Sequence, residues 1–245
     1  MSAIIEVHNL IKRYGHKPVL KKLDFSANQG EFVALLGPNG AGKTTFLRIL
    51  STLAKPNFGS VTISGFQLPN QSAHIRQRLG VVSHQPLLYG DLSAEENLKF
   101  FSRLYGLHPA KDRIAEILKL IGLEKRKFDL VRTYSRGMQQ RLAIGRAILH
   151  DPEVLLLDEP HTGLDQDASN ILDGILNQVA MRGRTVVMTS HDLGRVANLA
   201  SRFDVLTRGF IQASINIKDL PKHGLLEYYQ DVLANSDEKV KAHAS

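Results

Sequence analysis

The sequence predicts an α/β fold, in which a mostly parallel sheet follows an N-terminal antiparallel β part and is interrupted by an inserted helical lobe. Three observations support this prediction. Apolar runs punctuated by glycine fill the first ninety residues, only helical patterns occur between about 91 and 150, and apolar strands alternate with helices after that. Strands that alternate with helices are typical of a parallel sheet covered by helices on its faces.

The strands expected in the first part are short apolar runs bounded by glycine or turn residues. They are predicted at residues 4–8, 32–36, 61–64 and 81–82. One helix is expected in this part, directly after Thr45, because apolar residues recur there at helical spacing. Those residues are Phe46, Leu47, Ile49 and Leu50.

Three helices are predicted in the inserted lobe. Ser93 is expected to cap the first, because Glu96 stands three residues later as in a capping box. The second is expected over 109–121 and the third from about 137 to 149. Gly145 lies inside the third, where glycine costs roughly 1 kcal/mol relative to alanine, and we expect it to allow close packing.

The α/β pattern resumes after the lobe and ends in a short tail. The elements predicted here are a strand at 154–157, a helix at 167–181, a strand at 185–189, a helix at 193–199, a hairpin over 203–215 turning at Gly209, and an amphipathic piece at 225–233. One domain is therefore expected over residues 1–217, with its helical lobe at about 91–150. Residues 218–245 are expected to form a C-terminal helical tail.

The composition excludes several classes of protein. The 245 residues are 43% hydrophobic and 22% charged, which is typical of a globular chain. Cysteine is absent, so disulfide frameworks and thiolate metal sites are excluded. The apolar stretches are far shorter than the roughly 20 residues of a membrane-spanning helix, and the N-terminus lacks a signal-peptide pattern. We expect a soluble chain that stays in the cytosol.

The net charge of +7 comes from 31 Lys and Arg against 24 Asp and Glu. These basic residues are spread along the chain, with small clusters at 21–22 and 125–127 that no aromatic residues interleave. This pattern favours a solvated surface with anionic ligands over a nucleic-acid interface.

The strongest local signal is a phosphate-binding loop at residues 37–45. Its sequence, GPNGAGKTT, satisfies G-x-x-x-x-G-K-[ST], with an apolar strand before it and a helical pattern after it. Glycines let the backbone wrap a phosphate closely, and the amides and the helix N-terminus then face the anion. Lys43 is expected to bind the outer phosphates, and the Thr44 hydroxyl to bind Mg²⁺. The predicted nucleotide-binding residues of this loop are Gly37, Pro38, Asn39, Gly40, Ala41, Gly42, Lys43, Thr44 and Thr45. Such a P-loop alone does not separate ATPases, GTPases and small-molecule kinases.

Two carboxylates, Asp158 and Glu159, follow the apolar strand at 154–157. A parallel strand emerging beside the P-loop strand would place Asp158 near the metal ion. Glu159 would then face the space beyond the γ-phosphate, where it could polarise an attacking water. A carboxylate placed on water favours hydrolysis over transfer to another acceptor.

Further motifs carry a family resemblance. The segment YSRGMQQRLAIGRAI begins at Tyr134, and TGLD occupies 162–165. Gln85 and His191 each follow a predicted strand. Together with the P-loop and the acid-ended strand, this set resembles the nucleotide-binding subunit of ABC transporters over about residues 3–215. The resemblance implies a P-loop NTPase fold that binds ATP and Mg²⁺.

The resemblance also implies roles for individual residues in the nucleotide site. Tyr14 would stack on adenine. Gln85 would contact Mg²⁺ or the attacking water and couple the helical lobe to the transport machinery. His191 would contact the γ-phosphate and act in catalysis with Glu159, Gln85 and Lys43.

Three more residues would act across a homodimer. Ser135 and Gly137 belong to the signature segment, which in this family contacts ATP held by the opposite subunit, and Asp165 would join the two sites. The usual signature is LSGGQ, whereas this chain has Arg136 in place of the first glycine and Met138 in place of the glutamine. Arg136 could strengthen the phosphate contact or face a membrane partner.

The implied protein is a homodimeric ATPase, peripheral on the inner face of the cell membrane, that powers export through separate transmembrane subunits. Among exporters it looks most like the haem-exporter subunit of cytochrome c biogenesis, with multidrug and polysaccharide exporters as alternatives. Another alternative is a non-transport ABC ATPase that acts on nucleic acid or ribosomes. A P-loop kinase for a small acceptor would leave the signature segment and His191 without a role.

Overall fold

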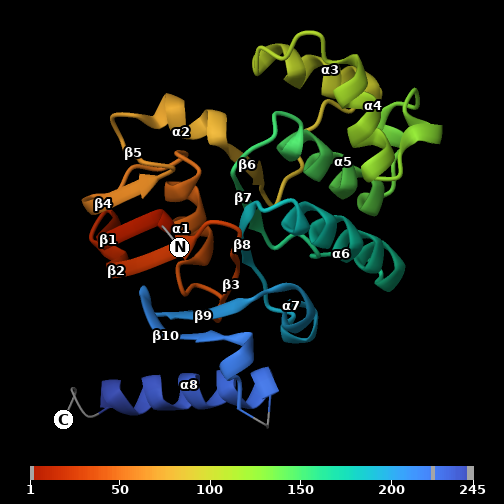
Figure 1. Ribbon diagram of the computed structural model, residues 1–245. Coiled ribbons are helices and arrows are strands. Elements are labelled where there is room, and N and C mark those ends of the chain that lie inside the picture. The colour runs from red at the N-terminus through yellow and green to blue at the C-terminus, as the bar shows by residue number, and fades with distance from the viewer. Residues whose placement is uncertain (1–2, 222–223, 242–245) are drawn as a thin grey trace.

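The chain contains two sheets, as the computed structural model shows for residues 3–221 and 224–241. A four-stranded antiparallel sheet lies next to a six-stranded, mostly parallel sheet, and a group of helices stands on the other side of the latter (Figure 1). The predicted α/β fold is confirmed. No helix within the described ranges has the length and apolar character required to cross a membrane.

The six-stranded sheet forms the centre of the fold. Its strands, in order, are β10 (Phe210–Asn216), β9 (Arg202–Thr207), β3 (Phe32–Leu36), β8 (Thr185–Thr189), β7 (Val154–Asp158) and β6 (Leu79–Val82). Neighbouring strands run parallel, except that β10 pairs antiparallel with β9 in the predicted hairpin. Every residue of β3, β7 and β8 is buried, and parallel strands covered on both faces need such continuous apolar runs.

The antiparallel sheet contains β2 (Lys17–Asn28), β1 (Ala3–Tyr14), β4 (Phe58–Ile63) and β5 (Phe66–Gln67) in that order. Buried and exposed residues alternate along much of β1 and β2, so one face covers the core. The core beneath it includes Phe46 of helix α1 (Lys43–Leu50) and Ile75 of helix α2 (Ser72–Arg78). The sequence predicted only residues 4–8 of β1, and did not predict β2 or α2.

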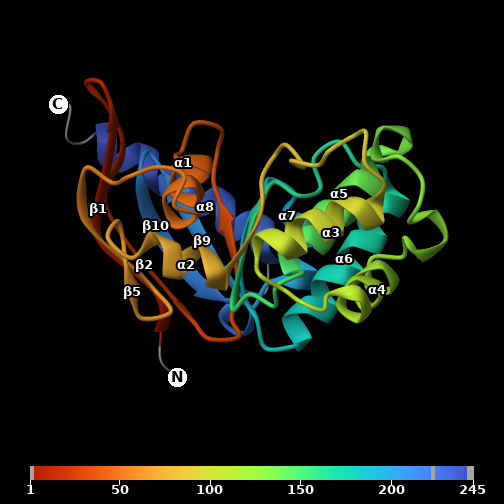
Figure 2. The same cartoon turned by 90° about the horizontal axis from the view of Figure 1, so that it is seen from above.

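The helices other than α2 occupy the positions predicted for them, with changes at their ends. They are α1 (Lys43–Leu50), α2 (Ser72–Arg78), α3 (Ala94–Leu104), α4 (Lys111–Leu120), α5 (Arg136–Ile148), α6 (Gln166–Met181), α7 (Leu193–Leu199) and α8 (Gly224–Lys241), with short 3₁₀ turns at Glu124–Arg126, Val131–Thr133 and Ile217–Asp219. Seen from above, α3 to α6 gather on one side and the antiparallel sheet lies on the other (Figure 2).

The helix ends follow local chemistry. Ser93 and Glu96 form the predicted capping box at α3, in which each side chain binds the other residue's backbone N–H. Helix α4 begins at Lys111, two residues after the predicted start, because Ala110 is its N-cap. Helix α8 continues to Lys241, past the predicted end at residue 233. The helical spacing of apolar residues ends near residue 233, so the sequence pattern does not predict the rest of this helix.

Gly145 allows α5 to pack closely on α4, as expected. A Cβ at this position would lie 2.8 Å from Cδ1 of Ile121 and 3.0 Å from Cγ2 of Ile117. Both isoleucines belong to the core that the helical lobe shares with the parallel sheet. The helix-propensity cost of Gly145 therefore accompanies a contact that a larger residue would disturb.

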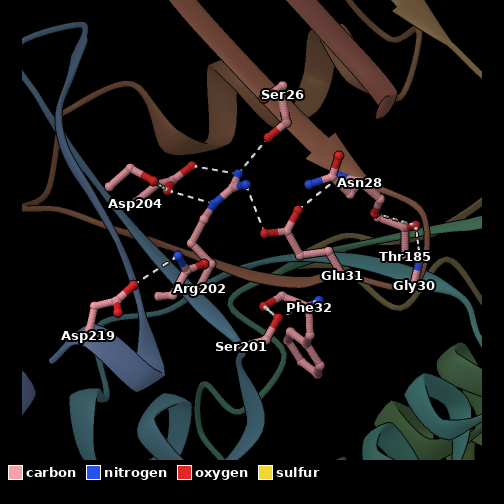
Figure 3. Close-up of polar contacts among 12 residues, drawn as sticks. Ser26, Asn28, Gly30, Glu31, Phe32, Thr185, Ser201, Arg202, Asp204 and Asp219 are labelled. Atoms are coloured by element: carbon pink, nitrogen blue, oxygen red, sulfur yellow. Dashed lines mark hydrogen bonds and ion pairs between the residues drawn. The ribbon is translucent and has the colours of Figure 1, made fainter. Parts of the chain in front are cut away.

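Arg202 ties the antiparallel sheet to the parallel one (Figure 3). At the start of β9, its guanidinium bonds Glu31 Oε1 at 2.8 Å, the Ser26 carbonyl at 2.5 Å and Asp204 Oδ1 at 3.0 Å. The Arg202 side chain is only 12% exposed and that of Asp204 only 3%. Burial raises the pKa of Asp204, while the Arg202 charge and a hydrogen bond from Ser214 oppose that rise.

We expect Arg202→Met to lower the free energy of unfolding by about 3–5 kcal/mol, because it leaves the buried Asp204 and partly buried Glu31 carboxylates without their cation. Chemical denaturation of the purified chain measures this. Arg182→Gln is the matched control, since its ion pair with Glu116 is 43% and 45% exposed, and exposed pairs contribute about 0–1 kcal/mol. Equal effects of the two substitutions would contradict this role of Arg202.

Candidate functional site

The P-loop connects the carboxyl end of β3 to the first turn of α1, as predicted. Gly37 has φ +153°, and a Cβ there would lie 2.1 Å from the Leu206 carbonyl oxygen. Gly42 is the N-cap of α1 with φ +115°, a conformation that L side chains rarely adopt. Two positions of the loop therefore require glycine for backbone reasons, apart from any ligand.

Lys43 is held inside this loop. Its Nζ donates hydrogen bonds to the Gly37 carbonyl at 2.6 Å and the Pro38 carbonyl at 3.2 Å, and the residue is 7% exposed. Burial lowers the pKa of Lys43, and the charges of Glu159 and Asp158 oppose that effect. A poorly hydrated ammonium held by two carbonyls is ready to bind an anion with little loss of hydration.

Asp158 ends β7 and lies next to the P-loop. Its Oδ1 accepts hydrogen bonds from the Thr44 hydroxyl at 3.3 Å and the Thr189 hydroxyl at 2.8 Å. Strand β7 does not lie beside β3 as expected, because β8 lies between them. Thr44, at the start of α1, nevertheless forms a hydrogen bond with the Asp158 carboxylate.

Thr44 and Asp158 suit a magnesium ion. Mg²⁺ prefers oxygen ligands and keeps several waters, so it usually binds one or two protein groups together with phosphate oxygens. A hydroxyl and a carboxylate oxygen 3.3 Å apart provide such a pair. In the part of the chain that the structure describes, no cluster of three or more His, Asp or Glu side chains could hold a metal ion by itself. The pair therefore fits a cation that arrives with a phosphate ligand.

Glu159 follows directly and has a left-handed backbone, with φ +52°. Its N–H bonds the hydroxyl of Thr189 at 3.0 Å. Its Oε2 lies 2.5 Å from His191 Nδ1 and accepts a bond from the Thr162 hydroxyl at 3.3 Å. Strained backbone that persists at a polar site is a signature of functional positioning. Here it turns the carboxylate toward a histidine at the end of the neighbouring strand.

Several of these residues, though not Asp158, line one pocket of about 990 Å³. Lys43, Thr44, Glu159 and His191 lie on its wall, together with the predicted loop residues from Asn39 to Thr45 and Tyr14. Gly37 and Pro38 contribute the carbonyls that hold Lys43. The pocket opens at the carboxyl ends of the parallel strands, where ligands bind in open α/β sheets.

Tyr14 lies at the edge of the pocket and is 49% exposed. The Lys12 ammonium lies 4.9 Å from the centroid of its ring. An exposed ring on a nucleotide-sized pocket fits the predicted stacking on a base, which stays a prediction.

Several lining residues were not predicted. They are Lys17, Pro18, Val19, Lys21, His84, Thr162 and Arg208. Lys17 and Lys21 come from β2, and Arg208 comes from the turn after β9, far away in the sequence. No local motif marks them, and only the fold brings them to the pocket.

Gln85 is not among the residues that line the pocket, and its neighbour His84 is. Gln85 is exposed, and its carbonyl accepts a 2.6 Å hydrogen bond from the Ser83 hydroxyl. Its contact with a metal ion or water stays a prediction.

Ser135, Gly137 and Asp165 also lie outside the pocket of their own chain. Ser135 caps α5 by accepting a 3.3 Å bond from the Met138 N–H, and Asp165 caps α6 by accepting a 2.7 Å bond from the Ala168 N–H. Each residue has a structural role in this subunit. The roles predicted for them across a dimer stay predictions.

Comparison with known proteins agrees with this geometry. The family model described as "ABC transporter" matches residues 20–162. The linearmycin resistance ATP-binding protein LnrL of Bacillus subtilis (strain 168) is 38% identical over 208 residues, which cover 84% of this chain and 67% of that protein. The Nod factor export ATP-binding protein I of Burkholderia orbicola (strain AU 1054) is 41% identical over 209 residues, which cover 84% and 69%.

Solved structures show the same fold. An ATP-binding subunit of an ABC transporter superposes with a TM-score of 0.86 at 30% identity, covering 94% of this chain and 99% of the other. The ATP-binding cassette MJ0796, in a dimeric post-hydrolysis state bound to ADP and Pi, superposes with a TM-score of 0.78 at 28% identity, covering 88% and 100%. The P-loop, the acid-ended strand and these relatives together place the chain in the ABC transporter family, as one of its ATP-binding subunits.

Proposed function

We propose that this subunit hydrolyses ATP in the pocket at the ends of β3, β7 and β8, and that hydrolysis powers export through separate membrane subunits. The observation that carries the proposal is the convergence of Lys43, Thr44, Glu159 and His191 on one pocket, with Asp158 bonded to Thr44. This set holds a polyphosphate, fits a divalent cation and offers a base for water.

The proposed reaction uses the observed contacts. Lys43 and the loop amides bind the β- and γ-phosphates, and Thr44 with Asp158 would hold Mg²⁺, which offsets phosphate charge. A water attacks the γ-phosphorus, the bond to the β–γ bridging oxygen breaks, and Glu159 accepts the proton of the water. His191, bonded to Glu159 at 2.5 Å, orients the carboxylate, and it would contact the γ-phosphate.

We propose that the site is completed in a homodimer. Ser135 stands at the N-terminus of α5, where unpaired amides and the helix dipole attract an anion. Ser135 does not line the nucleotide pocket of its own chain, and we infer that a second subunit brings the two together. The dimeric structures of MJ0796 support this arrangement for a related cassette. Two ATP molecules would then lie between P-loops and signature segments, and Asp165 would lie near both.

A groove between the helical lobe and the rest of the chain supports a membrane partner. It has a volume of about 550 Å³, and its wall is mostly apolar, formed by residues of α2, β6, α3 and α5. Leu53, Leu87 and Leu104 line it and are 62%, 58% and 66% exposed. Large apolar side chains exposed together mark a binding surface. We infer that it receives an amphipathic segment of the membrane subunit, and that the chain is peripheral on the inner face of the membrane.

Export is the direction that the relatives support, since one is named for linearmycin resistance and others for Nod factor export. The cargo is proposed no more narrowly than that. Haem export for cytochrome c biogenesis stays a prediction about the cargo. Multidrug export and polysaccharide export stay the alternatives to it.

We expect tagged Glu159→Gln protein with Mg-ATP to capture a multi-span membrane protein from detergent-solubilised native membranes, because slow hydrolysis preserves the ATP-bound complex. Mass spectrometry identifies the captured proteins. Adding Leu104→Asp should lower the recovery about 10-fold or more, since a charge in a desolvated apolar contact is costly.

Phe128→Asp is the matched control for that substitution, because Phe128 is 71% exposed and lies outside the groove. Recovery should be unchanged. Capture of ribosomal proteins in place of a membrane protein would favour the non-transport alternative. An equal loss of recovery in both variants would exclude the groove as the docking site of the membrane subunit.

A further inference from the structure

Arg136 stands where the signature of this family commonly has a glycine, and its side chain contacts another loop of the same chain. Its Nε donates a 3.0 Å hydrogen bond to the carbonyl oxygen of Thr162. Thr162 belongs to the loop between β7 and α6, which begins next to Glu159. The signature segment and this loop are therefore joined within one subunit.

Gly163 makes room for the Arg136 side chain. A Cβ at Gly163 would lie 2.8 Å from Nε and 2.9 Å from Cζ of Arg136, so the guanidinium packs directly against the loop backbone. Gly163 also has φ +75°, which favours glycine. Glycine is therefore favoured at this position for two reasons: the backbone conformation of the loop and the space occupied by the Arg136 side chain.

Thr162 carries the contact onward to the catalytic carboxylate. Its N–H bonds the Glu159 carbonyl at 3.1 Å, and its hydroxyl bonds Glu159 Oε2 at 3.3 Å. The residue is therefore bonded to Arg136 on one side and to Glu159 on the other. Rotation of the Thr162 backbone would disturb both contacts.

The helices on either side limit how far these parts can move separately. A Cβ on Gly137 would lie 2.7 Å from Cβ of Ala168, so the first turns of α5 and α6 pack closely. Asp165 caps α6 at the end of the same loop. The N-terminus of α5, the loop and the N-terminus of α6 thus form one packed unit.

We propose that Arg136 is a positioning residue that couples the signature segment to Glu159 of its own chain through Thr162. The proposal rests on the proposed function, in which Ser135 binds the nucleotide of the opposite subunit. Engagement of the opposite nucleotide would then bias the position of the carboxylate in the subunit that supplies Ser135. The arginine serves this role through its hydrogen bond to Thr162 and its packing against Gly163, and it does not line the nucleotide pocket of its own chain.

The first test is hydrogen exchange of the nucleotide-free chain, which does not depend on ATP hydrolysis. Arg136→Met keeps an unbranched apolar stem and removes the guanidinium donors. We expect exchange in the peptide containing Thr162 and Leu164 to rise about 3- to 10-fold, the range that one ordinary hydrogen bond carries. Arg132→Met is the matched control, because Arg132 is nearby, exposed and paired with Asp91.

The second test is steady-state kinetics. Arg136→Met should lower kcat for ATP about 3- to 10-fold, with KM unchanged because Arg136 does not line the nucleotide pocket. Thr162→Val, which removes the hydroxyl bonded to Glu159, should produce a similar loss. The double variant should lose little more than the worse single variant, because both substitutions break the same connection.

Three results would overturn the coupling. Arg136→Met could match Arg132→Met in exchange and in kcat, or it could raise KM with kcat unchanged, which is the signature of a phosphate ligand. Arg136→Lys could preserve both wild-type values, which would show that charge alone suffices. If the wild-type chain hydrolyses no ATP, the proposed function fails, and the exchange experiment still decides whether Arg136 holds the loop.

Discussion

Glu159→Gln is expected to lower the rate of ATP hydrolysis about 10²-fold or more, the loss typical of removing a positioned general base. The amide keeps the size of the side chain but cannot accept the proton of the attacking water. ATP binding should remain, because Lys43 and the P-loop are untouched. Phosphate release and equilibrium binding of a fluorescent ATP analogue measure the two properties separately.

Glu153→Gln is the matched control for this substitution. Glu153 is 48% exposed and pairs with Arg78 outside the nucleotide pocket, so its loss should leave the rate within about 2-fold of wild type. An unchanged rate in Glu159→Gln would contradict the assignment of the catalytic base.

Lys43→Ala is expected to weaken ATP binding about 10²-fold or more and to abolish measurable hydrolysis. Removing one partner of a desolvated, hydrogen-bonded charge pair costs about 2–5 kcal/mol, and Lys43 is only 7% exposed. Titration calorimetry of the purified chain with Mg-ATP measures the affinity.

Lys21→Ala is the control, because Lys21 lines the same pocket while its ammonium lies 5.7 Å from the Phe210 ring. It should change the affinity by less than about 5-fold, as expected for a solvent-screened charge. Similar losses in both variants would show that Lys43 contributes only general positive charge. Thermal unfolding should accompany the titration, because Lys43 also bonds two carbonyls of its own loop.

The parts of the site that could be predicted are those whose chemistry is contiguous in the sequence. The P-loop contains its own glycines and lysine, and the buried strands β3 and β8 were predicted with the bounds that the structure has. Continuous apolar runs identify strands that are covered on both faces. Asp158 and Glu159 could be found because they end such a run.

Strand β2 could not be predicted, because its pattern is interrupted. Lys21 and Lys22 adjoin in the middle of the strand, and Lys22 has φ +54°. Antiparallel pairing with β1 makes up for this local irregularity, and the pattern of β2 alone does not reveal that pairing. The same limit applies to His84, which reaches the pocket through tertiary structure alone.

The order of the strands and the contacts of Arg136 could not be predicted from the sequence either. The sequence placed the strand of Asp158 beside the P-loop strand, whereas β8 lies between them. For Arg136 it left two alternatives, a phosphate contact or a membrane partner. The structure shows a third contact, with the Thr162 carbonyl, which depends on the packing of α5 against α6.

We propose that a second copy of the chain completes the nucleotide site. Sedimentation of Glu159→Gln with Mg-ATP tests this proposal most directly. We predict a dimer that retains two ATP molecules per two chains. Adding Ser135→Arg should return it to a monomer, because the larger side chain blocks the N-terminus of α5. A Glu159→Gln chain that binds ATP but stays monomeric, together with a wild-type turnover per chain that is independent of protein concentration, would contradict the claim.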